Sequence, residues 1–163
     1  MGCNCPYGSQ TISTSNFTPS APVLANSSRQ AVERGGYIIS DTATPEGILL
    51  AAGSEVQLAL RVKQQLQGKG FNIRVVSMPC IEIFKHQPLM YQEKVLPPAI
   101  TTRLAIEMAT LSIWSQFVGL TGKVMGIERF GKSGSGAAVV ADFGFTVANI
   151  VKNFINIWRQ NCH

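Results

Sequence analysis

The sequence predicts an α/β protein: a three-layer α/β/α sandwich around a mixed, mostly parallel sheet of about five strands. Residues 48–52 form a short, continuously apolar run, typical of a strand buried on both faces, and Gly53 supplies a tight turn after it. A helical pattern follows from Ser54, which forms a capping box with Gln57, and a second apolar run covers 73–78. A strand, a helix and a strand in this order predict a βαβ unit with a right-handed parallel crossover.

The first strand is expected just before this unit. Residues 36–40 are a short β-prone run, and the turn-rich segment 41–47 links them to the apolar strand. So short a link cannot make a parallel crossover. We therefore expect the first strand to run antiparallel to the next one and to lie at an edge of the sheet.

Short helices and two further strands are expected after the unit. The patterns predict helices at 80–87 and 89–95, which a proline separates, and strands at 102–108 and 123–127. A last helix is expected to begin near Thr146, an N-cap candidate. Its apolar residues repeat at helical spacing and are Val147, Ile150, Val151, Phe154, Ile157 and Trp158.

Length and composition predict one domain, at 35–163, behind a flexible tail at 1–34 that is rich in Ser, Thr, Asn and Pro. The 163 residues are 45% hydrophobic and only 14% charged, which favours a domain that packs against something else. The net charge is +5, but the 14 Lys and Arg are scattered singly, which indicates solvated surface charge and no nucleic-acid partner.

No apolar run approaches the roughly 18 residues of a membrane span, and the N-terminus has no pattern of a secretion signal. We therefore expect no membrane partner and a cytoplasmic location. The four cysteines are too few and too irregularly spaced for a disulfide framework, so reduced thiols are expected.

One motif matches a phosphate-binding pattern. Residues 126–133 read Gly-Ile-Glu-Arg-Phe-Gly-Lys-Ser, which fits G-x-x-x-x-G-K-[ST] after a strand. In a P-loop the Lys-Ser pair opens a long helix, whereas here Ser and Gly alternate over 133–136. A glycine-rich connection is the favoured interpretation, and nucleotide binding stays an alternative.

Other candidate sites are weaker. Cys80 lies where a strand gives way to a helix and His86 is six residues on, but without an orienting partner a structural thiol is favoured over a nucleophile. Gly53 and Ser54, at a helix start, are a candidate anion site, because exposed amides and the helix dipole favour negative charge there. We expect no metal site. Three carboxylates lie on separate elements and are interpreted as surface or cap residues: Glu82, Glu93 and Glu107.

Taken together, several stretches resemble the C-terminal domain of the transketolase family. The resemblance runs in order over about 35–159. The stretches that carry it are Arg34-Gly-Gly-Tyr-Ile-Ile-Ser-Asp41, Ile48-Leu-Leu-Ala-Ala-Gly-Ser-Glu-Val-Gln-Leu-Ala59, Val75-Val-Ser-Met-Pro-Cys80, Tyr91-Gln-Glu-Lys-Val-Leu-Pro97, Gly126-Ile-Glu-Arg-Phe-Gly131 and Phe143-Gly-Phe-Thr146. The resemblance also accounts for the phosphate-loop match, because a Gly-Ile-acidic-Arg-Phe-Gly turn is a family feature.

The resemblance implies an enzyme that transfers a two-carbon ketol unit between sugar phosphates. It also implies that thiamine diphosphate and a divalent metal are held by two preceding domains, which supply a Gly-Asp-Gly motif and a catalytic glutamate at a dimer interface. The sequence contains no Gly-Asp-Gly, so we expect no catalytic, cofactor-binding or metal-binding residue in this chain. Ser28-Arg29-Gln30 resembles a family triplet whose arginine contacts the sugar phosphate, which makes Arg29 the candidate substrate-phosphate residue.

Three functions stay open at this point. The first is a structural and assembly domain of a transketolase, inactive alone, whose partners are the remaining domains of a homodimeric enzyme. The second is a subunit of a split transketolase, in which a partner chain carries the cofactor domains. The third is a small nucleotide-binding regulator that uses Gly131 to Ser133.

Overall fold

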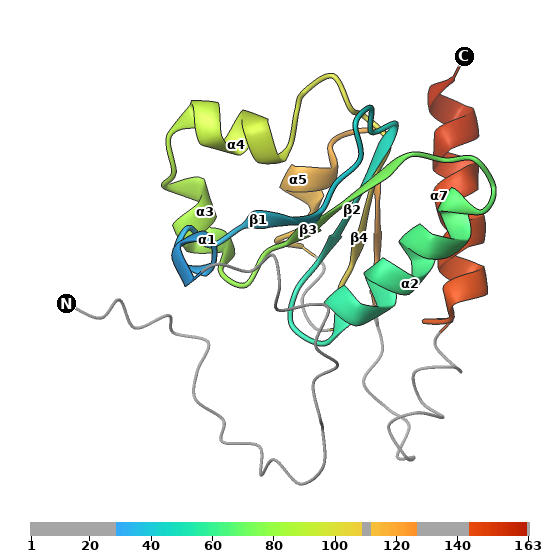
Figure 1. The fold of residues 1–163 in the computed structure, drawn as a ribbon, viewed down its shortest axis with the longest axis horizontal. Helices are drawn as coiled ribbons and strands as arrows, with labels where there is room; N and C mark the ends of the chain where they lie inside the picture. The colour runs from blue at the N-terminus through green and yellow to red at the C-terminus, as the bar shows by residue number, and fades with distance from the viewer. Residues whose placement is uncertain (1–28, 109–111, 127–143, 163) are drawn as a thin grey trace, which may run out of the picture.

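The fold is seen in a computed structural model that describes residues 29–108, 112–126 and 144–162 (Figure 1). Within these ranges, short helices and strands follow one another along the chain, and a long helix closes it. The elements are α1 Arg29–Glu33, β1 Tyr37–Ser40, β2 Gly47–Ala51, α2 Glu55–Gln67, β3 Ile73–Ser77, α3 Ile81–Lys85, α4 Leu89–Val95, β4 Arg103–Ile106, α5 Ser115–Val118, β5 Lys123–Met125 and α7 Val147–Asn161.

The described strands form one mixed sheet in the order β1-β3-β2-β4-β5. Strand β3 pairs in parallel with β2, as do β4 with β2 and β5 with β4, while β1 runs antiparallel to β3 at the edge. The predicted sheet and its antiparallel edge strand are therefore confirmed. The sequence did not indicate which strand β1 would join. Strands β3 and β4 pair with the two edges of β2, and β5 pairs with the outer edge of β4. Strand β1 pairs with the remaining edge, which is the outer edge of β3.

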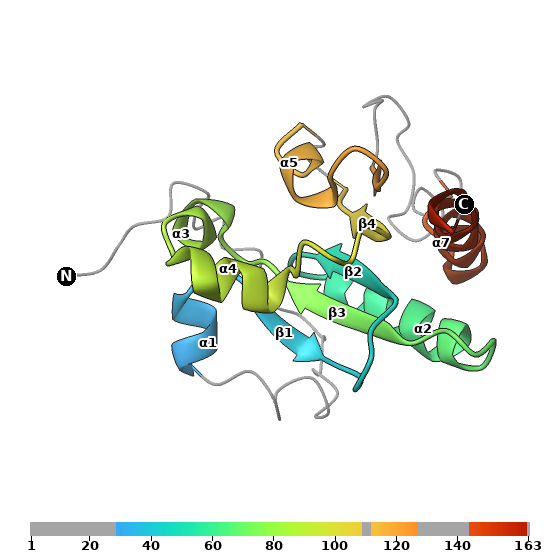
Figure 2. The same ribbon diagram turned by 90° about the horizontal axis from the view of Figure 1, so that it is seen from above.

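Helices cover both faces of the sheet, which confirms the three layers (Figure 2). Helices α2 and α7 lie on one face, and α3, α4 and α5 lie on the other. Strand β2 is buried along its whole length and contributes side chains to the cores on both faces of the sheet. Leu49 and Ala51 pack into the core beneath α2 and α7, and Ile48 and Leu50 pack into the opposite core. This alternation explains why the sequence of β2 is apolar without interruption.

Helix α7 begins where the sequence predicted. The hydroxyl of Thr146 accepts a hydrogen bond from the backbone N–H of Asn149 at 3.2 Å, so Thr146 is the N-cap. The apolar face of α7 then packs on the sheet, and Phe71 lies edge-on against Phe154 and Trp158. Helix α7 is therefore fixed both at its first turn and along its length.

The first described element, α1, lies within the last residues of the segment for which the sequence predicted a tail. Residues 1–28 of that segment, with Cys3 and Cys5, lie outside the described residues. Cys80 is half-buried and Cys162 is exposed. Among the helices that the structure describes, none is long and apolar enough to cross a membrane.

Candidate functional site

The turn after β2 lies at the carboxyl end of the parallel strands, where ligands commonly bind in α/β sheets. Gly53 has a φ of +53°, which favours glycine, and it turns the chain into α2. Ser54 is the N-cap of α2, but its side chain makes no capping bond, and its backbone is already helical. Its hydroxyl donates instead to the carboxylate of Glu55 at 3.0 Å. The predicted capping box of Ser54 and Gln57 is therefore wrong, because the adjacent carboxylate competes for the serine hydroxyl.

The same contact bears on the anion site predicted at Gly53 and Ser54. Glu55 is almost fully buried in the first turn of α2, and a Cβ on Gly53 would lie 3.8 Å from one of its carboxylate oxygens. A carboxylate at this place already interacts favourably with the helix dipole. A further anion would meet the negative charge of Glu55. The anion site stays a prediction, and the geometry disfavours it.

The Cys80 and His86 pair is separated by helix α3. Cys80 is the N-cap of α3, and its backbone N–H donates to the carbonyl of Gly35 at 3.0 Å. His86 is the C-cap, and its Nδ1 lies 2.7 Å from the carbonyl oxygen of Glu82. The two residues thus lie at opposite ends of α3, which favours the structural interpretation of the thiol.

The three carboxylates named in the sequence analysis lie on different elements. Glu82 forms a 3.6 Å ion pair with Lys85 on the surface of α3, and Glu93 is exposed on α4. Glu107, just after β4, accepts a hydrogen bond from the indole N–H of Trp114 at 3.1 Å. In the described parts of the chain, no group of three or more His, Cys, Asp or Glu could hold a metal ion.

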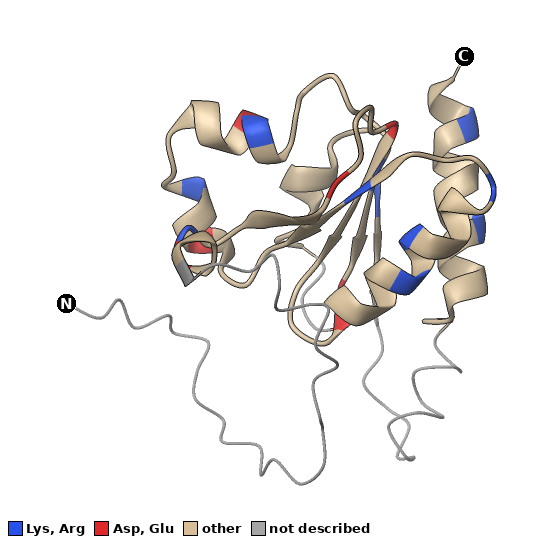
Figure 3. Ribbon diagram, in the orientation of Figure 1, with Lys and Arg blue, Asp and Glu red and all other residues tan. Residues whose placement is uncertain are grey.

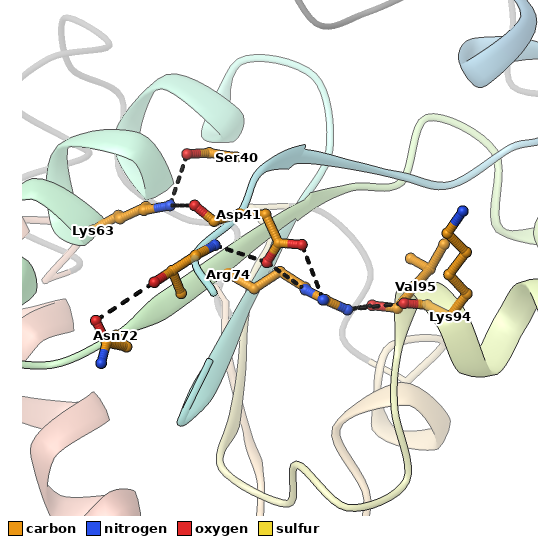
Figure 4. Close-up of polar contacts among 8 residues, drawn as sticks. Ser40, Asp41, Lys63, Asn72, Arg74, Lys94 and Val95 are labelled. Carbon is orange, nitrogen blue, oxygen red and sulfur yellow. Dashed lines mark hydrogen bonds and ion pairs between the residues drawn. The ribbon is translucent and has the colours of Figure 1, made fainter. Parts of the chain in front are cut away.

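The densest set of charged contacts lies at the opposite end of the strands (Figure 4). Asp41 follows β1, and Arg74 lies on β3 beside it. The guanidinium of Arg74 donates from Nε and Nη2 to the two oxygens of Asp41, at 2.9 and 3.0 Å. Its Nη1 donates to the carbonyls of Lys94 and Val95 at 2.8 and 3.2 Å. Arg74 thus ties the end of β1 to the end of α4.

Lys63 reaches the same place from α2 (Figure 4). It is only 4% exposed, and its ammonium donates to the hydroxyl of Ser40 at 2.8 Å and to the carbonyl of Asp41 at 2.9 Å. Burial lowers the pKa of the Lys63 ammonium, and the carboxylate of Asp41 offsets part of that effect. The sequence analysis missed Lys63. Its position next to Val62, at the border of the apolar face of α2, is the signal that could have found it.

The pKa of the Asp41 carboxyl is set by opposing effects. Burial by itself would raise this pKa, but the hydrogen bonds from Arg74 and the Thr42 amide, with the charges of Arg74 and Lys63, leave it below its ordinary value. The Asp41 carboxylate is therefore favoured in its charged form, and Arg74 and Lys63 also donate hydrogen bonds to backbone carbonyls. This arrangement joins β1, β3, α2 and α4.

A second half-buried arginine joins the segment before β4 to α5. Arg103 donates to the carbonyls of Ile100, Phe117 and Pro97, each at 2.8 Å, and to that of Leu96 at 3.3 Å. Burial lowers its pKa. Because its described partners are backbone carbonyls, Arg103 fixes the path of the chain around the edge of the sheet.

The remaining predicted site residues lie partly or wholly outside the residues that the structure describes. Arg29 is the first residue of α1, and its side chain is outside the described residues. Gly126 follows β5, and residues 127–133, which complete the phosphate-loop match, are also outside them. Both assignments stay predictions.

These features define an α/β domain with a mixed sheet and an antiparallel edge strand. Its buried and half-buried Lys and Arg side chains donate hydrogen bonds to the backbone. The family model described as the Transketolase-like TK C-terminal domain matches residues 35–146. The chain therefore belongs to the family of transketolase C-terminal domains.

Comparisons with single proteins agree. The transketolase of Geobacillus stearothermophilus is 40% identical over 143 residues, which cover 86% of this chain and 21% of that protein. The solved transketolase of Leishmania mexicana superposes with a TM-score of 0.77 at 30% identity, over 83% of this chain and 20% of the other. This chain thus spans about a fifth of the length of these relatives.

A split-gene transketolase, solved as an inactive beta4 tetramer, is a more distant neighbour. It superposes with a TM-score of 0.61 at 15% identity, over 78% of this chain and 43% of the other. At that identity the likeness shows the fold alone.

Proposed function

We propose that this chain acts as the C-terminal structural and assembly domain of a transketolase and is inactive alone. The observation that carries the proposal is the extent of the similarity: 40% identity over 86% of this chain corresponds to 21% of the Geobacillus enzyme. The buried charged contacts that fix β1, α4 and α5 support a packing role. In the complete enzyme the reaction would be transfer of a two-carbon ketol unit between sugar phosphates.

The cofactor belongs to the rest of the enzyme in this proposal. Thiamine diphosphate and a divalent metal would be held by the other domains, through the Gly-Asp-Gly motif that this sequence does not contain. The complete enzyme would be a cytoplasmic homodimer, and Arg29 would contact the sugar phosphate only in that assembly. The apolar composition, 45% hydrophobic residues, supports burial of part of this domain against its partners.

Calorimetry tests whether the chain acts alone. We expect no heat of binding when thiamine diphosphate and magnesium are titrated into the isolated chain, and no ketol transfer by it. The Geobacillus enzyme is the positive control in both measurements. Measurable affinity of the isolated chain for thiamine diphosphate would contradict the proposal.

A chimaera tests the assembly role directly. Residues 35–162 of this chain would replace the matching part of the Geobacillus transketolase, and we expect the purified product to dimerise and to transfer ketol units. The matched control carries Gly47→Ala, which weakens the packing of Phe154 of α7 on β2, and we expect less dimer and less activity from it. A chimaera that is folded by circular dichroism but stays monomeric and inactive would count against the proposal.

A second candidate is a subunit of a split transketolase. The chain spans about a fifth of the Geobacillus enzyme and contains no Gly-Asp-Gly, so a second polypeptide that supplies the cofactor domains would complete an active enzyme. It predicts that the tagged chain, expressed in its source cell, co-purifies with a second polypeptide that contains Gly-Asp-Gly. Purification of the chain without such a partner would exclude this candidate.

A further inference from the structure

A groove of about 470 Å³ lies between α2 and α7, on the outer side of the helical layer. The C-terminal end of α2 contributes Gln65, and Lys69 follows it, while α7 contributes Lys152, Asn156 and Arg159. All of these polar residues are exposed, so the groove is open to solvent. The groove is separate from the charged cluster around Asp41 and from the turn at Gly53.

The charge of this groove has one sign. Its lining holds three cations and no carboxylate, and in the described parts of the chain none of these three cations forms an ion pair. Figure 3 shows that α7 carries basic and no acidic residues, and the acidic residue of the neighbouring α2 lies in its first turn, away from the groove at its C-terminal end. Three like charges around one small groove repel one another, and a bound anion would relieve that repulsion.

Helix ends account for part of the pattern. Arg159 lies in the last turn of α7 and Lys69 just beyond the end of α2, where cations interact favourably with the helix dipole. Each helix end carries about half a negative charge, so two ends offset roughly one of the three positive charges. Lys152, in the middle of α7, is not explained in this way. A net charge of about +2 remains at the groove by the same arithmetic.

We propose that this groove binds a linear polyphosphate chain, free or attached to a small organic group. Lys152 and Arg159 are seven residues apart on one helix, which separates them by about 10 Å along its axis at about 1.5 Å per residue. Two or more linked phosphates span this distance, so that separate phosphate groups can contact the two cations at once. The side-chain amides of Gln65 and Asn156 supply uncharged donors between the cations. The proposal does not depend on the assembly role above.

Titration of the full chain with inorganic tripolyphosphate, without magnesium, tests the site. We expect saturable binding at one site that weakens with added salt. Lys152→Gln and Arg159→Gln should each raise the Kd by roughly two- to fivefold, as for exposed charge pairs. Orthophosphate should bind more weakly than tripolyphosphate. ATP binding as tightly as tripolyphosphate would assign recognition to the phosphates, and tighter ATP binding would assign a contribution to the attached group.

Two matched variants keep the test specific. Lys94→Gln removes one exposed positive charge from α4, on the other face of the sheet, and should leave the Kd unchanged. Lys132→Gln alters the phosphate-loop match and should also leave it unchanged. An equal loss in Lys94→Gln, binding lost only in Lys132→Gln, or no saturable binding would each overturn the proposal. Lys94, Lys152 and Arg159 are exposed, and unchanged urea midpoints would confirm that all four variants fold.

Discussion

Asp41 is a carboxylate whose side chain is 42% exposed, yet it receives two hydrogen bonds from one guanidinium. Arg74 itself is only 11% exposed, and its other hydrogen bonds go to the backbone carbonyls of Lys94 and Val95. Bidentate pairs of this kind are among the stronger charge-assisted hydrogen bonds. The exposure of Asp41 to solvent limits what the pair contributes to stability.

The lowered pKa of Asp41 predicts an acid-sensitive contribution to stability. Because the pKa is lower in the folded chain than in the unfolded one, the contribution is complete above about pH 4 and is lost as the pH falls through the folded value. Asp41→Asn should lower the free energy of unfolding by about 1 kcal/mol or less at pH 7, and this difference should shrink toward about pH 2.

Urea unfolding at several pH values measures this effect. Glu93→Gln removes an exposed carboxylate from α4 and controls for the change in net charge. A deficit of Asp41→Asn that stays constant from neutral to acid pH would refute the role of the Asp41 charge.

Gly47, the first residue of β2, is a second residue whose identity the packing requires. A Cβ at this position would overlap the ring of Phe154 and lie 3.2 Å from the carbonyl oxygen of Thr102. Gly47→Ala should therefore destabilise the chain by about 1–3 kcal/mol. Gly68→Ala is the matched control, because its Cβ would meet Gln65 at an ordinary 3.5 Å, and its stability should be unchanged or raised by up to about 1 kcal/mol. Equal urea midpoints of the two variants would contradict the clash.

At the scale of elements, helices α2 and α7 begin in different ways. Thr146 caps α7 through its hydroxyl, whereas Ser54 at the start of α2 donates to Glu55 and makes no capping bond. The acidic side chain in the first turn of α2 compensates through its charge near the helix dipole. A hydroxyl side chain thus indicates the start of a helix in both places, but it does not indicate which interaction stabilises that start.

This difference predicts unequal costs. Thr146→Ala should lower the free energy of unfolding by about 1 kcal/mol through the lost N-cap. Ser54→Ala should change it by less than about 0.5 kcal/mol. Chemical denaturation of both variants measures the difference, and an equal cost would support the capping box that the sequence suggested.

At the scale of the whole molecule, the sheet separates two apolar cores that share β2. Trp114 is buried in the core beneath α3, α4 and α5, and Trp158 packs against the other core beside Phe71, with ring centroids 5.2 Å apart. Because residues of β2 alternate between the two cores, loss of either core exposes the strand that supports the other. The domain should therefore unfold as one cooperative unit.

The two tryptophans make this cooperativity measurable, since the chain has only these two. Trp114→Phe and Trp158→Phe each leave one fluorescent reporter, on opposite sides of the sheet. In each variant, the fluorescence transition in urea should coincide with the transition seen by far-ultraviolet circular dichroism. Separate transitions in either variant would show that the two sides unfold independently.

Local patterns predicted much of this fold. The apolar run of β2, the turn at Gly53 and the periodicity of α7 are properties of neighbouring residues, so the sequence alone identified the βαβ unit, the closing helix and the family. The antiparallel direction of β1 also followed from the short link of 41–46, because chain length limits the geometry of a connection.

Only the tertiary structure decided which distant residues meet. The bonds from Lys63 to Ser40 and from Arg74 to Asp41 join residues at least 23 apart in the sequence. The groove cations come from the turn after α2 and from α7, which are distant in the sequence. Burial of apolar residues depends on their own periodicity, whereas polar pairing depends on which strand edges and helix faces come together. For that reason the sequence determined the layers and the family, and the packing of those layers determined the charged contacts.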